Sequence, residues 1–282
     1  MSSYLVGLIG SDIGSSLSPP LHEREAGELG LRYEYRLIDI VELGLGADDV
    51  GDLVGRAGEQ GYTGLNITHP CKRAVVRHLD ELSPVAAQLG AVNTVVLAAG
   101  RAVGHNTDGY GFAEGFVRNL SGASLRDVVL VGAGGAGAAV ARALLGLGVA
   151  RLTVVDVDAD RVSQLVAALG AGARVTAGAT DRLEELVKAA DGLVNATPVG
   201  MRAHPGVPVP AAYLHAGLWV ADVVYRPLHT ELLRAARALG CRTLDGGGMV
   251  VYQAAEAMRL FTGREPDAER MYRHFLELTA DA

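Results

Sequence analysis

The chain has 282 residues, a hydrophobic fraction of 49%, and 25 Lys and Arg against 32 Asp and Glu, which gives a net charge of −7. That much apolar sequence is more than one core of about 100 to 150 residues uses, so we expect two domains. The acidic balance, without a basic cluster, argues against a nucleic-acid partner.

The cysteines and the apolar runs of the sequence bear on the compartment in which the protein is expected. Cys71 and Cys241 lie far apart and match neither a disulfide framework nor a CxxC motif, as expected in a reducing compartment. The start MSSYLVGLIG lacks the basic region and long apolar core of a signal peptide, and no run approaches the roughly 18 apolar residues of a membrane span. We therefore expect a cytoplasmic protein without a membrane partner.

The first third of the chain predicts an α/β domain. The apolar runs YLVGLIG, YEYRLIDI and GLNIT alternate with helical patterns at about 19–30 and 48–60, the order that builds a mostly parallel sheet. The stretch AVNTVVLAAGRAVGHNT then predicts two strands joined by a tight AAGR turn. A connecting helix is expected over 109–120.

A second alternation of strands and helices begins at Asp127. DVVLVG and RLTVVD predict strands followed by helices that end near Gly148 and Gly170, and LVNAT and LWVADVVY predict further strands. Beyond CRTLDGGG, the segment MVVYQAAEAMRLFTG predicts an amphipathic helix, and Pro266 is expected to start a last helix that runs to the end. The pattern alone assigns these final helices to neither domain.

A glycine-rich loop follows the strand that begins at Asp127. Gly132, Gly134 and Gly137 have GxGxxG spacing directly after a strand and at the start of a helix, the context that dinucleotide binding requires. The three glycines permit a tight turn, close approach of a pyrophosphate, and close packing of helix on strand. Free N–H groups of the helix N-terminus would face the phosphates. We expect a Rossmann domain whose cofactor loop includes Gly135 and Ala136; a turn of purely structural use is the alternative.

The next strand ends in an acid, which favours NAD. Asp156 lies about 20 residues beyond the motif, where an acid accepts hydrogen bonds from the adenosine ribose hydroxyls. A 2′-phosphate would meet Asp156 and Asp158, with Val157 rather than an arginine between them, so NADP is disfavoured. Arg161 is within reach of a phosphate, but we interpret it as an adenine-stacking or surface residue.

Eight motifs point to a family. SLSPPLHE, GLNITHPCK, LGAVNTV, GHNTDGYG, VGAGGAG, VNATPVGM, DVVYRP and DGGGMVVYQAAEAM, in this order and across nearly the whole chain, resemble the shikimate dehydrogenase family, most of all its NAD-dependent quinate/shikimate dehydrogenase branch. The resemblance implies a catalytic, substrate-binding α/β domain (1–108 plus 250–282), a Rossmann NAD-binding domain (109–249) and an active-site cleft between them. It also implies hydride exchange between a nicotinamide and shikimate or quinate.

By the same resemblance, the lysine of NxTxPxK and the aspartate of NTD form a catalytic pair, here Lys72 and Asp108. Oxidation of a secondary alcohol needs a group that takes the hydroxyl proton as hydride leaves for the nicotinamide. We expect Lys72 to be the acid/base and Asp108 to orient it and bind the reacting hydroxyl, without deciding which of them carries the proton. For Lys72 taken alone, a surface lysine at a helix start is the alternative.

The resemblance implies further binding residues. Neutral hydrogen-bonding groups suit a polyol, because such a site rejects analogues that lack a hydroxyl. For the substrate these are Ser16 and Ser18 at the carboxylate, Asn66, Thr68, Asn93 and Gln253 at the ring hydroxyls, and Tyr225 closing over the carboxylate or cofactor side. For the nicotinamide pocket they are Asn195, Thr197, Val223, Gly246 and Met249. The histidines show no metal-ligand spacing, so no metal is expected.

Two features of the sequence bear on the choice of cofactor and substrate. Family members that use NADP typically have an Asn-Arg-Thr-like sequence where this chain has residues 156–158, whereas Ser18 stands where some quinate users have threonine. Three alternatives stay open: an NADP-dependent biosynthetic shikimate dehydrogenase, a dehydrogenase for amino analogues of these acids, and a non-catalytic sensor on the same fold. The expected assembly is a monomer or homodimer.

Overall fold

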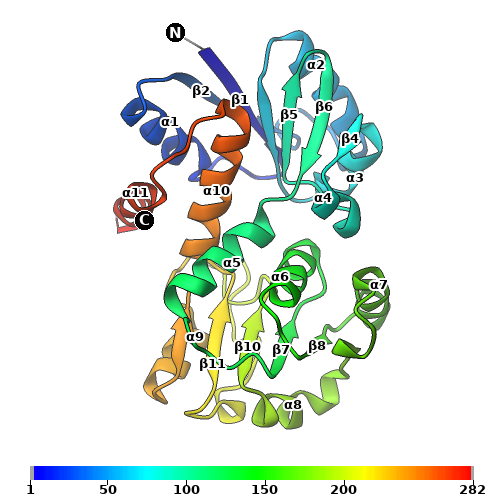
Figure 1. The fold of residues 1–282 in the computed structure, drawn as a ribbon, viewed down its shortest axis with the longest axis vertical. Coiled ribbons are helices and arrows are strands. Elements are labelled where there is room, and N and C mark those ends of the chain that lie inside the picture. The colour runs from blue at the N-terminus through cyan, green and yellow to red at the C-terminus, as the bar shows by residue number, and fades with distance from the viewer. Residues whose placement is uncertain (1–2, 281–282) are drawn as a thin grey trace. The chain divides into compact units, whose positions relative to one another are not determined.

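The computed structural model describes residues 3–280, which form two compact units (Figure 1). Unit 1 runs to Thr107 and resumes at Val251, and unit 2 comprises Asp108–Val250. Each unit contains its own six-stranded sheet with helices, so the predicted class, two α/β domains, is confirmed. Within residues 3–280, no helix has both the length and the apolar character needed to cross a bilayer.

The sheet of unit 1 has the strand order β2-β1-β3-β5-β6-β4. Its strands are β1 (Ser3–Gly10), β2 (Arg32–Asp39), β3 (Gly64–Ile67), β4 (Glu81–Leu82), β5 (Thr94–Ala98) and β6 (Arg101–His105). β1 pairs in parallel with β2 and β3, because α1 (Ser18–Glu28) and α2 (Val50–Glu59) return the chain between them. The buried stripe of α2 packs on the sheet through Val50, Leu53, Val54 and Ala57.

The predicted hairpin forms two neighbouring strands of this sheet. β5 and β6 pair in antiparallel fashion, and the two turn residues, Ala99 and Gly100, have φ angles of 51° and 74°. Positive φ at both positions is what a two-residue hairpin turn of the favoured twist requires. Three short elements were not predicted, since so few residues show no periodicity: α3 (Cys71–Ala74), α4 (Pro84–Leu89) and β4.

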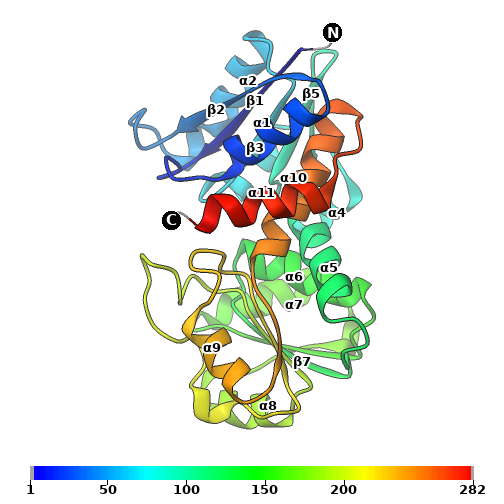
Figure 2. The same cartoon turned by 90° about the vertical axis from the view of Figure 1, so that its left-hand side faces the viewer.

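The two C-terminal helices complete unit 1. α10 (Gly247–Thr262) begins in unit 2 and continues into unit 1, where Ala257 and Phe261 pack against Val6 and Leu8 of β1. α11 (Ala268–Ala280) lies beside α1 (Figure 2). The last helix therefore starts two residues later than the prediction from Pro266, because the Asp267 carboxylate accepts a hydrogen bond from the Arg270 N–H (2.9 Å) and caps it.

The sheet of unit 2 is parallel throughout, in the order β12-β11-β10-β7-β8-β9. Its strands are β7 (Asp127–Val131), β8 (Arg151–Val155), β9 (Val175–Ala177), β10 (Gly192–Asn195), β11 (Trp219–Asp222) and β12 (Arg242–Leu244). Read from β9, this is the doubly wound dinucleotide-binding order, in which the chain reverses direction across the sheet between β7 and β10. Ligands of such sheets bind outside the carboxyl ends of the strands at that point.

The helices of unit 2 cover this sheet. They are α5 (Asp108–Asn119), α6 (Gly135–Gly146), α7 (Ala159–Leu169), α8 (Leu183–Ala189) and α9 (Glu231–Ala238). α5, α6 and α7 lie where the sequence predicts helices. Four short elements were not predicted: α8, α9, β9 and β12. The two helices are stabilised mainly by packing on β7, β10 and β11, and that packing is not visible in the sequence.

Candidate functional site

The glycine loop of unit 2 joins the carboxyl end of β7 to α6. Gly132 has φ +110°, and a Cβ there would lie 2.7 Å from the backbone of Ala196. A Cβ on Gly137 would lie 2.0 Å from the carbonyl oxygen of Gly132. Gly134 has nothing within 4 Å of such a Cβ, and Gly135 starts α6. Two glycines are therefore required by close packing, and the position between them is open, which fits a pyrophosphate at the helix N-terminus.

The acids after β8 are connected to this loop. Asp156 Oδ2 accepts a hydrogen bond from the Ala133 N–H (2.7 Å), and Asp156 Oδ1 accepts one from the Asp158 N–H (3.0 Å). Asp158 caps α7 through the N–H groups of Asp160 and Arg161 (both 3.1 Å), and its other oxygen lies 3.0 Å from Arg161 Nε. The Arg161 guanidinium, which follows the two acids in the sequence, is thus paired with Asp158.

A buried network holds the neighbouring strand ends. Asn195, at the end of β10, is 0% exposed and donates to Asp222 Oδ1 (2.9 Å) and to the Val199 carbonyl (3.2 Å). Its Oδ1 accepts from the N–H (3.0 Å) and hydroxyl (2.7 Å) of Thr197. Burial raises the pKa of Asp222, against hydrogen bonds from Val224, Thr230 and Asn195 that lower it. The Asn195 amide therefore positions the loop that carries Thr197, and its expected contact with a nicotinamide stays a prediction.

The other cofactor residues lie at the same edge of the sheet. The Val223 N–H donates to the Asn195 carbonyl (3.0 Å), and a Cβ on Gly246 would lie 2.4 Å from the Val223 carbonyl oxygen. Met249 lies in the first turn of α10. Tyr225 follows β11, and burial raises its pKa. The predicted cofactor residues thus lie at the carboxyl ends of β7, β8, β10, β11 and β12 or in the first turn of the helix that follows.

In unit 1, the predicted carboxylate ligands lie at the start of α1. Ser18 begins the helix and its N–H donates to Ser16 Oγ (3.2 Å). The next two residues, Pro19 and Pro20, have no N–H to offer. Anion recognition at this helix start would therefore depend on the serine hydroxyls rather than on backbone donors.

The predicted amides of unit 1 form one buried cluster. Asn66 on β3 donates to the Asn93 carbonyl and to Thr94 Oγ1 (both 3.3 Å). Thr94 donates to Asn93 Oδ1 (3.1 Å), which also accepts the Thr107 N–H (2.8 Å). The Asn93 NH₂ donates to Thr107 Oγ1 (2.9 Å) and lies 3.5 Å from Gln253 Oε1. The structure thus brings together Asn66, Asn93 and Gln253, from two strands' ends and α10.

Sequence reasoning missed three members of this cluster. Thr94 and Thr107 are buried hydroxyls, and Tyr35 on β2 donates its hydroxyl proton to Asn66 Oδ1 (2.8 Å). Burial raises the pKa of the Tyr35 hydroxyl. Thr94 and Thr107 lie within the motifs LGAVNTV and GHNTDGYG, so the sequence could have identified them. Tyr35 lies in a strand whose sequence pattern gives no functional signal.

The predicted catalytic pair is divided between the units. Lys72 lies on α3 of unit 1, one residue after the buried Cys71, and its carbonyl accepts the Val92 N–H (2.8 Å). Thr68, the residue of the motif that precedes it, accepts the Cys71 N–H through its carbonyl (2.8 Å). Asp108 is buried and is the first residue of α5 in unit 2, directly after Thr107.

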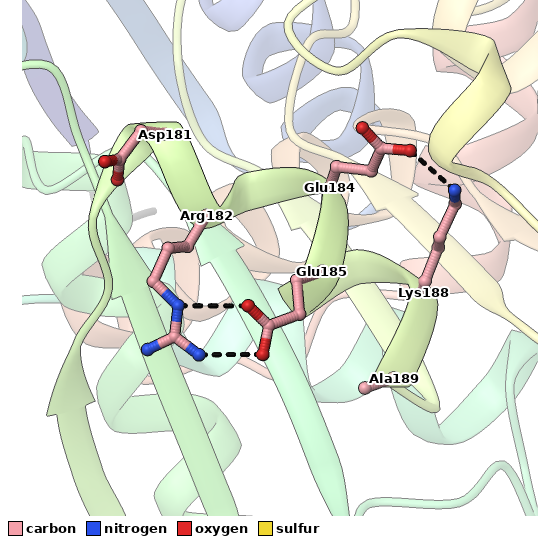
Figure 3. A pocket seen from close by; sticks show the side chains of 6 residues that line it. All are labelled: Asp181, Arg182, Glu184, Glu185, Lys188 and Ala189. Carbon is pink, nitrogen blue, oxygen red and sulfur yellow. Dashed lines mark hydrogen bonds and ion pairs between the residues drawn. The ribbon is translucent and has the colours of Figure 1, made fainter.

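A hollow on α8 and the turn before it contains no residue predicted to bind substrate or cofactor. Four of its charged side chains pair with each other, Arg182 with Glu185 (2.7 Å) and Lys188 with Glu184 (2.5 Å) (Figure 3). In the described part of the chain, no group of three or more His, Cys, Asp and Glu could hold a metal ion.

Known families match the chain along most of its length. The model described as shikimate dehydrogenase substrate binding domain matches residues 8–95, shikimate / quinate 5-dehydrogenase matches 116–200, and shikimate 5'-dehydrogenase C-terminal domain matches 246–274.

The individual relatives are named for two different cofactors, NADP and NAD. A shikimate dehydrogenase (NADP(+)) of Streptomyces avermitilis is 62% identical over 99% of this chain and 97% of its own length. A quinate/shikimate dehydrogenase (NAD(+)) of Corynebacterium efficiens is 50% identical over 98% of this chain and 99% of its own. Among solved structures, quinate dehydrogenase from Corynebacterium glutamicum in complex with NAD has a TM-score of 0.93 and 48% identity, over 98% of this chain and 99% of that one.

Proposed function

Because the chain belongs to the shikimate dehydrogenase family, an enzyme family of oxidoreductases that act on CH–OH groups, we propose that it is an NAD-dependent dehydrogenase of quinate and shikimate. The reaction interconverts the alcohol and its 3-dehydro ketone. In this proposal residues 1–108 and 250–282 bind the substrate, and 109–249 bind the cofactor.

The observation that carries the choice of NAD is the pairing at the end of β8. In this proposal Asp156 and Asp158 face the adenosine ribose, and the Arg161 guanidinium pairs with Asp158 (Nε to Oδ2 3.0 Å). A 2′-phosphate would therefore meet two carboxylates against one guanidinium that is already paired. The ribose hydroxyls of NAD, in contrast, can donate to the remaining lone pairs of Asp156.

In this proposal, side chains of this chain transfer the proton and hold the substrate. When bound, NAD supplies the hydride acceptor at C4 of its nicotinamide. Lys72, with Asp108 as its orienting partner, takes the hydroxyl proton as the alcohol is oxidised and returns it when the ketone is reduced. Ser16 and Ser18 hold the carboxylate end, and the amides of Asn93 and Gln253, supported by Asn66, together with Thr68, hold the ring hydroxyls.

An NADP-dependent shikimate dehydrogenase is the second candidate, because the relative that is 62% identical carries that name. One comparison of reaction rates distinguishes the two candidate functions. Purified protein is assayed with NAD and with NADP, on quinate and on shikimate, by the absorbance of reduced cofactor. We expect NAD to give the higher kcat/KM; a tenfold or greater preference for NADP would show that Asp156 and Asp158 do not exclude the phosphate.

Lys72→Ala tests the catalytic assignment. General acid–base catalysis contributes about 10²- to 10⁴-fold, so turnover should fall by at least 10²-fold while NAD affinity, measured by calorimetry, is unchanged. The matched control is Lys188→Ala, since Lys188 is the other lysine of the sequence and lies on the exposed face of α8, paired with Glu184. Equal turnover in the two variants would remove Lys72 from the mechanism. NAD binding without turnover of either substrate in the unaltered protein would favour a sensor.

A further inference from the structure

Asp39 is a buried carboxylate that the proposed mechanism does not use. It is the last residue of β2 and is 7% exposed. Its carboxylate accepts hydrogen bonds from the backbone N–H groups of Ile13 (2.8 Å), Val41 (3.0 Å) and Asp12 (3.2 Å). Burial opposes ionisation, but these N–H groups outweigh it and lower the pKa of Asp39. The group is therefore ionised at neutral pH and can only accept.

Two of the three donors belong to the loop between β1 and α1, residues 11–17, which carries Ser16. The middle of this loop is adaptable, because Gly14 has open space around it and glycine adopts many backbone conformations. Asp12 has a φ of 55°, a left-handed conformation that is uncommon outside glycine. Asp39 binds the N–H groups of this residue and of the next, so it holds the loop on the side of β1.

A series of hydrogen bonds leads from Asp39 to the two serines that are predicted to bind the substrate carboxylate. The N–H of Ile13 is bound by Asp39, and the carbonyl of Ile13 accepts the Ser16 N–H (2.9 Å). Ser16 Oγ then accepts the N–H of Ser18, the first residue of α1 (3.2 Å). The position of both serines therefore depends on the turn that Asp39 anchors.

The same loop is tied to the segment that carries the predicted catalytic lysine. The Ser11 N–H donates to the carbonyl of His69 (3.0 Å), three residues before Lys72. The residue after Asp39 donates its N–H to the Gly10 carbonyl (2.9 Å), at the end of β1. Asp39 thus fixes the serine loop where the ends of β1 and β2 meet the lysine segment, all within unit 1.

We propose that Asp39 is a positioning residue for the substrate carboxylate, because it holds the backbone of residues 12–16 so that the hydroxyls of Ser16 and Ser18 are in place before the substrate arrives. Groups that are ordered in advance lose less entropy on binding. The inference rests on the proposed function, in which these two serines bind the carboxylate.

Asp39→Asn tests the inference at nearly constant size. An amide has one acceptor atom and one donor group, so at least one of the three N–H groups loses its acceptor. KM for shikimate should rise about tenfold, which corresponds to about 1.4 kcal/mol, while kcat and KM for NAD each change by less than about threefold.

The matched control is Asp80→Asn in the same unit. It removes the same charge from a carboxylate that also accepts a backbone N–H, that of Ala102 on β6 (2.7 Å), and it should leave KM for shikimate unchanged. An unchanged KM in Asp39→Asn would overturn the proposal. A lower KM would overturn it as well, because the charge of Asp39 would then act by repelling the substrate.

The methyl ester of shikimate separates positioning from stability. Hydrogen bonds to a charged acceptor are stronger than those to a neutral one, so displaced serine hydroxyls should penalise the acid more than the ester. The acid-to-ester ratio of kcat/KM should therefore fall about fivefold in Asp39→Asn. A lower melting temperature with an unchanged ratio would show that Asp39 supports only the fold.

A double-mutant cycle asks whether Asp39 acts through Ser16. In a Ser16→Ala background, Asp39→Asn should raise KM for shikimate by less than about threefold, and a full further tenfold rise would refute this route. Should Asp39→Asn not fold, hydrogen exchange in the unaltered protein decides. The amides of Asp12 and Ile13 should be protected without substrate, and exchange at the rate of an unstructured chain would contradict the proposal.

Failure of the proposed function has a different signature. If the unaltered protein oxidises neither shikimate nor quinate, the proposed function is wrong, and calorimetric titration with shikimate then judges the inference. Binding that weakens about tenfold in Asp39→Asn and not in Asp80→Asn supports it. Equal binding by the two variants, or no binding by the unaltered protein, refutes it.

Discussion

Replacement of Glu25 by alanine should destabilise unit 1 strongly, because this carboxylate joins α1 to α11 from a fully buried position. Glu25 is 0% exposed and accepts from Arg270 Nη2 (2.7 Å), Arg270 Nε (2.9 Å) and the Asp267 N–H (2.8 Å). The alanine variant would leave all three donors without this partner at the start of the last helix.

The magnitude follows from the burial of the pair. Breaking a buried ion pair by removing one partner costs about 3–5 kcal/mol. The Arg270 side chain is 25% exposed, so it regains some hydration, and we expect the lower end, about 3 kcal/mol. At about 2–4 °C per kcal/mol for a chain of this class, the melting temperature should fall by about 6 to 12 °C.

The neighbouring residue gives a matched control on the same two helices. Arg24 pairs with Glu277 across α1 and α11 at 2.6 Å, but these side chains are 45% and 60% exposed. Such surface pairs contribute about 0–1 kcal/mol, so Arg24→Ala should shift urea-induced unfolding of the protein very little. Equal losses of stability in Glu25→Ala and Arg24→Ala, followed by circular dichroism, would refute the reasoning that burial decides the contribution.

Two further predictions concern pH and cofactor choice. Burial lowers the pKa of His22 from 6.5 to about 3, so the unfolded chain binds a proton at His22 before the folded chain does. The free energy of unfolding therefore has its full value above pH 6.5 and falls by about 1.4 kcal/mol per pH unit as the pH falls towards 3. In the His22→Phe variant, the midpoint of urea unfolding should change less with pH between pH 6.5 and 4. An unchanged pH dependence would contradict this assignment. Asp158→Asn keeps the cap of α7 but frees Arg161, so the NADP-to-NAD ratio of kcat/KM should rise about tenfold, whereas Asp160→Asn, with the same loss of charge, should change it much less. Equal ratios in the two variants would show that the Asp158–Arg161 pair does not control the choice.

The local signals of the chain were sufficient for the framework. Alternating apolar runs predicted the strands β1, β2, β3, β7 and β8, because such runs of β-branched and aliphatic residues are buried wherever they pack. Gly132 and Gly137 were readable because each position forbids a Cβ for steric reasons that any GxGxxG turn shares. The hairpin at Ala99 and Gly100 was readable from its tight turn.

The partners of the polar side chains, and the direction of their hydrogen bonds, were determined by the tertiary structure alone. The contact of Asn195 with a nicotinamide stays a prediction; its amide bonds Asp222, which the pairing of β10 with β11 brings to it, and Thr197 and Val199 of the loop after β10. Tyr35 and Asn66 meet because β1 lies between β2 and β3 in the sheet. A hydrogen bond depends on which donor faces which acceptor, and strand order, rather than spacing along the chain, sets that arrangement. The sequence by itself thus determined the two α/β units and the cofactor loop, while packing determined which hydroxyls and amides offer a proton and which accept one.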